Sequence, residues 1–200
     1  MSLEPVMSWF DGQPEDATPL TPDEREGLIP SHVTLRRELN ELEQQNILEA
    51  DNWAFSRRRN PLTEAFARSL HRRMFARIWS WAGTYRTSNK NIGVEHWQVQ
   101  PKLVEALDNA RYGTSNEIYP SDELAVRLHH VLVFIHPFPN GNGRWSRMMA
   151  DLTVVRLGNQ RFTWGRNALL TPGITRRTYI ETLRAADNHQ FAPLLAFARS

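Results

Sequence analysis

Apolar residues recur at steps of three and four positions along most of the chain after residue 33, and this helical period restricts the fold more than any other feature. The clearest stripe is Leu124, Leu128, Leu132 and Ile135, which ends where Pro137 disfavours helical geometry in the residue before it. Helices are predicted near residues 34–55, 62–83, 101–113, 121–136, 148–158 and 191–197, and after residue 175. Strands do not alternate with helices as they do in a parallel sheet, so the fold is predicted to be mainly α, a helical bundle.

One segment, from Tyr85 to Gln100, lacks this period. Two short apolar runs, IGV at 92–94 and WQV at 97–99, flank a polar pair at 95–96, a pattern typical of two strands joined by a tight turn. We therefore expect a short β-hairpin in this segment.

The first 33 residues have little periodicity and many acidic residues. Prolines interrupt them at Pro5, Pro14, Pro19, Pro22 and Pro30. This composition predicts an irregular N-terminal arm over residues 1–33, followed by one domain over residues 34–200.

The composition excludes several classes of protein. The chain has no cysteine, no apolar run long enough to cross a bilayer and no signal-peptide pattern at its N-terminus, so a cytoplasmic protein without membrane contact is expected. Its 24 basic residues are nearly balanced by 22 acidic ones. Direct binding to nucleic acid is not expected, because a DNA footprint needs clustered positive charge.

The segment HPFPNGNGRWSR, residues 136–147, lies between two apolar helices and is unusual for a linker. Gly141 and Gly143 bracket Asn142 directly before a helix, so the backbone can approach a ligand and point N–H groups toward it. The helix dipole adds positive potential at this end. The pattern indicates an anion site suited to a diphosphate.

Three charged or titratable residues lie within this segment. Arg144 and Arg147 are three residues apart and share one helical face, from which they could reach neighbouring phosphates. His136 could take a proton from an incoming hydroxyl. Taken singly, a histidine at a helix end is usually structural, a GNG is usually a turn and arginines are usually surface charges. The combination favours a nucleotide site.

The segment resembles the motif H-x-F-x-[D/E]-G-N-G-R-x-x-R of the Fic (Fido) family. The positions in register are His136, Phe138, Gly141, Asn142, Gly143, Arg144 and Arg147. The run IWSWAGTYR at 78–86 looks like the helix end before the flap of that family, which gives a Fic-type bundle with a core over residues 60–198. Residues 18–47 further resemble the subgroup called mobile mystery protein B, whose members are encoded on mobile elements beside a small partner.

The resemblance implies a protein adenylyltransferase that moves AMP from the co-substrate ATP to a Ser, Thr or Tyr hydroxyl of a target protein. By the same resemblance, His136 is expected to be the general base, Arg144 to hold the inner phosphates and Arg147 to hold the terminal one. The anion cradle is Gly141, Asn142 and Gly143. Phe138 is expected to fix the loop in the core.

The expected hairpin corresponds to the family's flap, which docks the target backbone. The docking residues are Asn91, Ile92, Gly93 and Val94. A target strand would add to the edge of such a flap. The alternative, a hairpin that merely covers the core, stays open.

Asn140 departs from the family motif, which has Asp or Glu there to bind magnesium. An amide oxygen is a weaker ligand for Mg²⁺ than a carboxylate, so Mg²⁺ is expected as a cofactor of reduced affinity. The alternatives are a phosphoryl or phosphocholine transferase, or a catalytically weakened nucleotide-binding module.

Many relatives are inhibited by a helix with the pattern [S/T]-x-x-x-E-[G/N]. Glu26-Gly27 is close to it, but Thr21 misses the position by one residue and Pro22 occupies it. Inhibition is therefore expected from a separate partner chain, as in a toxin with an antitoxin encoded nearby.

Overall fold

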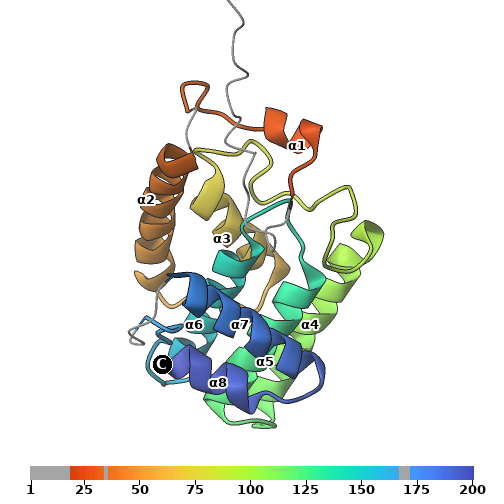
Figure 1. Ribbon diagram of the computed structural model, residues 1–200. Coiled ribbons are helices and arrows are strands. Elements are labelled where there is room, and N and C mark those ends of the chain that lie inside the picture. The colour runs from red at the N-terminus through yellow and green to blue at the C-terminus, as the bar shows by residue number, and fades with distance from the viewer. Residues whose placement is uncertain (1–18, 34–35, 167–171) are drawn as a thin grey trace, which may run out of the picture.

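The computed structural model describes residues 19–33, 36–166 and 172–200, which form a helical bundle (Figure 1). Its elements are α1 (Pro22–Glu26), α2 (Arg36–Phe55), α3 (Glu64–Phe75), the 3₁₀ helix η1 (His96–Gln98), α4 (Val99–Ser115), α5 (Ser121–Ile135), α6 (Asn142–Arg156), α7 (Pro172–Asp187) and α8 (Ala192–Arg199). Within the described residues the β contacts are limited to one isolated bridge between Leu28 and Trp79. The prediction of a mainly helical fold is confirmed.

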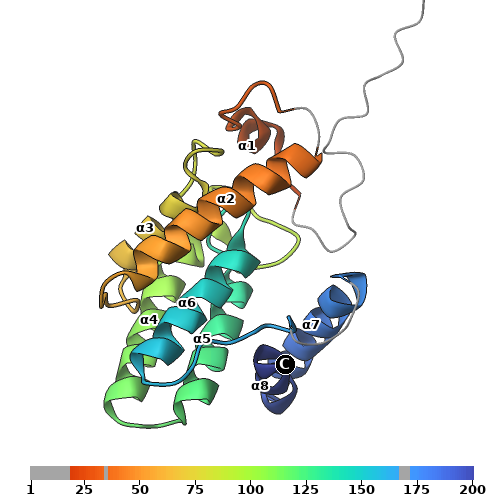
Figure 2. The ribbon, with the colours of Figure 1, turned by 90° about the vertical axis from the view of Figure 1, so that its left-hand side faces the viewer.

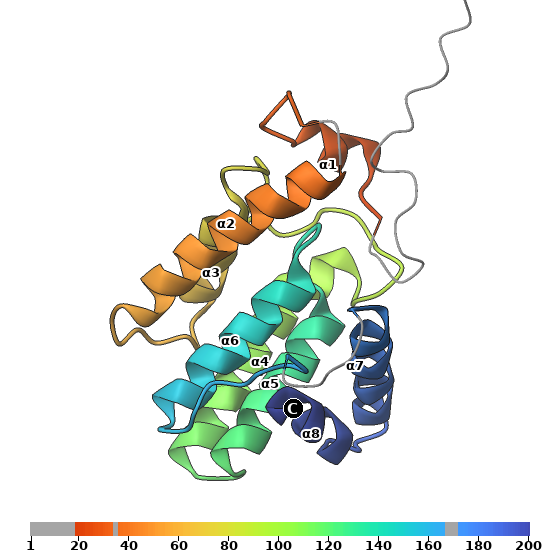
Figure 3. The same cartoon turned by 60° about the vertical axis from the view of Figure 1, so that its left-hand side comes forward.

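Helices α5 and α6 pack side by side in the middle of the bundle and are joined by the short loop that carries the motif (Figure 3). Helices α2 and α3 lie on one side of this pair, and α7 and α8 lie on the other (Figures 2 and 3). The central pair is therefore flanked by helices on two sides.

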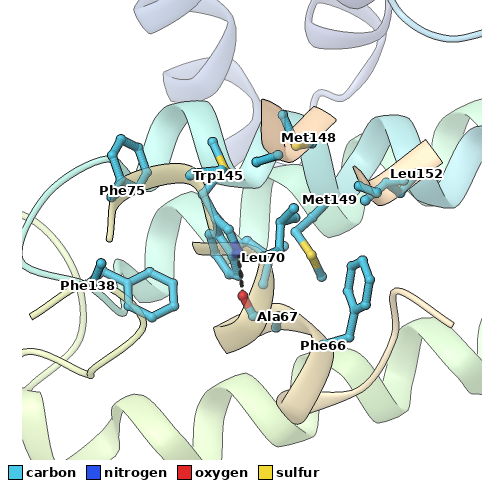
Figure 4. Close-up of a cluster of buried hydrophobic side chains, with 14 of the residues drawn as sticks. Phe66, Ala67, Leu70, Phe75, Phe138, Trp145, Met148, Met149 and Leu152 are labelled. Carbon is cyan, nitrogen blue, oxygen red and sulfur yellow. Dashed lines mark hydrogen bonds between the residues drawn. The ribbon is translucent and has the colours of Figure 1, made fainter. Parts of the chain in front are cut away.

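The buried core has two parts, one on each side of the central pair. In the larger part Trp145 of α6 is fully buried, and its indole N–H donates to the Ala67 carbonyl of α3 at 2.9 Å (Figure 4). The smaller part joins α5 and α6 to the C-terminal helices and includes Val154, Phe162, Trp164, Leu194 and Phe197. All four residues of the stripe predicted for residues 124–135 are buried, and Leu128 and Leu132 belong to the larger cluster.

The predicted β-hairpin is wrong, because no strand is found in residues 85–100. The segment is an irregular loop followed by η1, which leads directly into α4. Side chains bind the backbone groups that a partner strand would have bound: the Val94 carbonyl accepts from Arg86, and the His96 N–H donates to the Asn89 side chain at 2.9 Å. A backbone satisfied in this way needs no cross-strand partner.

Two other boundaries differ from the prediction. Helix α3 ends at Phe75 instead of near Gly83, because Ile78 accepts a hydrogen bond from Ile29 at 2.8 Å and Trp79 forms the bridge to Leu28. The predicted irregular arm contains α1, where Thr21 caps the helix by accepting from the Glu24 N–H at 3.3 Å. Pro22 occupies the first helical turn, in which its missing N–H is no loss.

None of the described helices combines the length and the apolar character that a membrane crossing requires.

Candidate active site

His136 lies directly after α5 in a left-handed conformation, with φ 53° and ψ 61°. This backbone region is uncommon for residues other than glycine, and it turns the chain sharply into Pro137. The histidine is 5% exposed, and burial lowers its pKa to about 4, against the raising effect of a hydrogen bond with the Val133 backbone. The imidazole is therefore neutral near pH 7 and able to accept a proton.

The loop after His136 is held from inside by its own side chains. Phe138 is fully buried and stacks on the His71 ring, with centroids 3.7 Å apart, so its predicted place in the core is confirmed. Asn142 accepts from the Phe138 N–H at 2.9 Å and donates to the Phe138 carbonyl at 2.8 Å. The Asn142 side chain is thus engaged by the loop, which leaves its backbone N–H as the Asn142 group that could donate to an anion.

His71 of α3 is a residue of this site that the sequence did not reveal. Its Nδ1 accepts from the Gly83 N–H at 3.0 Å, which leaves Nε2 as the donor to the Asn140 carbonyl, also at 3.0 Å. Burial lowers the pKa of His71 to about 3, so the ring stays neutral and keeps this tautomer. His71 therefore connects Gly83, in the segment after α3, to the motif loop.

The two glycines of the motif serve different purposes. Gly141 has φ 80°, and a Cβ there would lie 2.6 Å from the Phe75 ring. A Cβ at Gly143 would meet nothing within 4 Å, so this residue borders open space. At the start of α6 the N–H groups of Asn142, Gly143 and Arg144 have no acceptor within the helix, because they belong to its first turn. The geometry is suited to an anionic group.

The side chain of Asn140 is turned back on the loop. Its Oδ1 accepts from the Gly141 N–H at 2.6 Å. In the described part of the chain, no group of three or more His, Asp or Glu side chains is placed to hold a metal ion. The donors present therefore do not fit a magnesium ion held by the protein alone.

The two motif arginines have different surroundings. Arg144 forms an ion pair with Glu43 of α2, with 2.5 Å between Nη1 and Oε2, and the other Glu43 oxygen accepts from Trp79 at 3.0 Å. Arg147 donates to the Gly143 carbonyl at 3.1 Å, and burial lowers the pKa of its guanidinium. Across the described ranges no carboxylate lies within 4 Å of Arg147. Of the two, Arg147 has the charge that an anion can still neutralise.

Arg147 is instead packed against an aromatic ring. Its Cζ lies 5.5 Å from the ring centroid of Tyr179 on α7, and the Tyr179 hydroxyl is hydrogen-bonded to His129 at 3.0 Å. A cation over a ring gains stability without losing its charge. Sequence spacing gave no sign of this contact, because α5, α6 and α7 each supply one residue.

The flap residues, 91–94, are held beside the motif loop in two ways: Gly93 lies close to His136, and Arg86 bonds to both segments. Gly93 has φ 104°, and a Cβ there would lie 2.7 Å from the His136 Cβ. Arg86 is buried, and its Nε donates to the His136 carbonyl at 2.6 Å while Nη2 donates to Val94. Asn91 and Ile92 are exposed. The predicted flap residues are thus brought beside His136, although not as a strand.

Comparison with known families shows that residues 61–154 match the Fic/DOC family. The Protein adenylyltransferase Fic of Nematostella vectensis is 28% identical over 133 residues, which is 64% of this chain and 29% of that protein. The chain thus spans less than a third of the length of this curated relative.

Solved structures share the fold. The N-terminal FIC domain of Bep8 from Bartonella sp. 1-1C has a TM-score of 0.68 at 14% identity, covering 88% of this chain and 95% of that one. BepC of Bartonella tribocorum, solved with bound AMPPNP, has a TM-score of 0.64 at 17% identity and covers 88% and 95% of the two chains. Both likenesses concern the fold.

Proposed function

Residues 61–154 belong to the Fic/DOC family, and from this premise we propose that the chain is a protein adenylyltransferase that transfers AMP from ATP to a hydroxyl of a target protein. One observation carries the proposal: His136 ends α5 at the loop whose far end is the open N-terminus of α6. A proton acceptor and an anion site therefore lie at the two ends of a loop of five residues, 137–141. The relative from Nematostella vectensis, named a protein adenylyltransferase, supports the same activity.

In the proposed reaction the hydroxyl oxygen of the target forms a bond to the α-phosphorus of ATP. The bond from that phosphorus to the bridging oxygen breaks, pyrophosphate leaves and the hydroxyl proton goes to His136. The neutral state of His136 makes it available for this step. Bound phosphates beside the ring would raise its pKa and make the proton transfer more favourable than it is in the free protein.

The phosphates are proposed to lie on the α6 N-terminus, at the backbone of Gly141, Asn142 and Gly143. The Gly141 N–H already donates to Asn140, so the next N–H groups along the helix are the better donors. Arg147 is proposed to hold the terminal phosphates, because its charge has no carboxylate partner among the described residues. Arg144 would reach the inner phosphates only by sharing its guanidinium with Glu43.

The Asn140 side chain is neutral, and its oxygen already accepts from the Gly141 N–H. It would therefore be a weak ligand for magnesium. ATP carries its own phosphate ligands for Mg²⁺. We propose that metal affinity rests mainly on the nucleotide.

The loop at Asn91, Ile92, Gly93 and Val94 is proposed to dock the target backbone beside His136. The close approach of Gly93 to His136, which leaves no room for a Cβ at residue 93, supports this assignment.

The resemblance of residues 18–47 supports membership of the mobile mystery protein B subgroup, with a small partner or antitoxin encoded nearby. A cytoplasmic location is proposed from the absence of cysteine in the sequence.

The test is transfer of label from [α-³²P]ATP to bacterial lysate proteins by the wild-type chain and by His136→Ala. Labelled bands that need His136, with an added mass of AMP on a Ser, Thr or Tyr, are expected. Label from the γ position instead would indicate phosphoryl transfer. ATP binding without transfer, even by an Asn140→Asp variant, would identify a nucleotide-binding module that has lost catalysis.

A further inference from the structure

A hollow of about 520 Å³ lies between α1 and the loop 80–88, outside the phosphate site described above. One wall comes from α1 and its flanks, residues 21–24, 26 and 27, and the other from the loop 80–88, which follows α3. Pro139 of the motif loop forms part of the rim. The hollow has the volume of an ordinary ligand pocket, and it opens beside the loop that starts at His136.

The charge of this hollow is negative and only partly neutralised. Asp23 and Glu26 line it, and neither forms an ion pair with any described residue. Glu24 also lines it but is paired with Lys90. The one cation in the lining, Arg86, is buried and covered by backbone carbonyls, among them that of Ser88 at 2.9 Å. Two carboxylates therefore remain for a ligand.

The inner wall of the hollow is aromatic and held in place. The Trp81 indole N–H donates to the Glu24 carbonyl at 2.9 Å, and its ring stacks on Trp79 with centroids 4.9 Å apart. The Tyr85 hydroxyl donates to Glu64 at 2.8 Å. Arg68 already lies over the Tyr85 ring, with its Cζ 5.0 Å from the centroid. Such rings attract planar cations.

One polar atom at this wall lacks a partner. The hydroxyl oxygen of Ser88, a residue of the lining, is buried and has no hydrogen-bond partner in the described structure. An unmade hydrogen bond of this kind is unfavourable, and a ligand that donates a hydrogen bond to the oxygen could offset that cost.

We propose that this hollow is a specificity pocket for an arginine side chain of the target protein, a few residues from the hydroxyl that receives AMP. The proposal rests on the proposed function, which places a target backbone beside residues 91–94. A guanidinium matches the hollow better than an ammonium, because it stacks flat on Trp81 and presents several donors to Asp23, Glu26 and Ser88 at once. Target proteins that lack a nearby arginine are then poorer substrates.

The test measures binding without any transfer reaction. The ¹⁵N-labelled full chain is titrated with N-acetyl-arginine methylamide, and with the matched uncharged probe N-acetyl-citrulline methylamide. The reporter is the Trp81 indole N–H signal in the NMR spectrum, assigned with Trp81→Phe. A third probe, N-acetyl-lysine methylamide, separates guanidinium from ammonium recognition. The double variant Asp23→Asn/Glu26→Gln removes the charge, and Glu105→Gln/Asp108→Asn on α4 is the control.

The arginine probe should shift the Trp81 signal and the amides of residues 84–88 in a saturable way. Citrulline should bind at least about fivefold more weakly, because it loses two ion pairs, and lysine should lie between them. The shift should vanish in the Asp23/Glu26 variant and remain in the control. Equal binding of arginine and citrulline, or shifts that persist in the Asp23/Glu26 variant, would overturn the proposal. ATP is then added to the same sample, and the amide signals of residues 142–144 are followed. This measurement tests the nucleotide site separately from the hollow.

Discussion

The motif loop, residues 136–141, and the flap, residues 91–94, lie against each other but are held in different ways. The loop is bound by buried groups: Asn142 bonds to both backbone groups of Phe138, and His71 donates to Asn140. The flap is mostly exposed and is bound to the rest of the site through Arg86 and the close approach of Gly93 to His136.

This difference separates chemistry from recognition. A loop fixed by several buried hydrogen bonds keeps its N–H groups in place before the nucleotide arrives, which is how preorganised sites stabilise developing charge. A flap with few buried contacts can adjust to a partner backbone at little cost in stability. Substitutions in the loop should therefore affect both stability and activity, whereas substitutions in the flap should affect activity alone.

The largest expected effect comes from His136→Ala. Loss of a general base lowers the rate by a factor on the order of 10²–10⁴, so transfer of labelled AMP should fall below a hundredth of the wild-type level. His130→Ala is the control on the same helix, because His130 bonds to Asp187 at 2.8 Å, away from the loop. A His136→Ala chain as active as the His130→Ala chain would remove the proton acceptor from the mechanism.

The pH dependence of stability tests the burial of the loop histidine and its neighbours. Burial lowers the pKa of His71 and of His129 to about 3 and that of His136 to about 4. The unfolded chain, with histidine pKa values near 6.5, then binds more protons below that pH, so the free energy of unfolding should fall as pH drops from 6.5 toward 4. Urea unfolding at pH 7, 6 and 5 measures it. Equal stability at pH 7 and 5 would contradict the buried neutral state.

A pair of asparagine variants compares the two regions directly. Asn142→Ala removes two buried hydrogen bonds and leaves the Phe138 N–H and carbonyl unsatisfied, so unfolding should become easier by roughly 2–4 kcal/mol. Asn91→Ala in the exposed flap should change stability by less than about 0.5 kcal/mol. Denaturant midpoints of both variants give the answer. Similar losses in the two would show that the flap is as tightly built as the loop.

Gly93→Ala should reduce activity more than stability. The added Cβ would lie 2.7 Å from the His136 Cβ, so either the flap or the histidine must move. We expect transfer to fall about tenfold, since small displacements at a reacting centre are costly. Gly158→Ala is the matched control, because Gly158 also has a positive φ, 93°, but open space around it. Equal activity of the two variants would show that flap position is unimportant.

The smallest effect is expected for Asn140→Asp. The carboxylate can keep the hydrogen bond from the Gly141 N–H and adds a charged oxygen for Mg²⁺, so transfer at limiting Mg²⁺ should rise a few-fold. Rates measured across Mg²⁺ concentrations report it. An unchanged metal dependence would mean that residue 140 does not face the ion.

The sequence predicted the parts of the site that depend on local residues. Pro137 ends α5, Gly141 makes the turn, and the apolar stripes of α5 and α6 place the loop between them. The flap was predicted as part of a hairpin because two short apolar runs around a polar pair look the same whether a partner strand or a side chain such as Arg86 satisfies their backbone.

Other parts of the site lay beyond sequence reasoning because they join distant segments. His71 is 69 residues from Asn140, and Glu43 is 101 residues from Arg144. The period of an apolar stripe gives the face of a helix but not the polar residue that meets it across the bundle. The ion pair that already engages Arg144 is visible only once α2 is packed against α6.

In the proposed mechanism, the first turn of α6 binds a polyphosphate and His136 lies beside it. Titration of the ¹⁵N-labelled chain with ATP tests it directly, with the amides of residues 142–144 and the His136 ring nitrogens as reporters. We expect both sets to shift together with one dissociation constant, and the His136 ring to gain proton affinity. Saturable shifts confined to other residues, with these two sets unmoved, would contradict it.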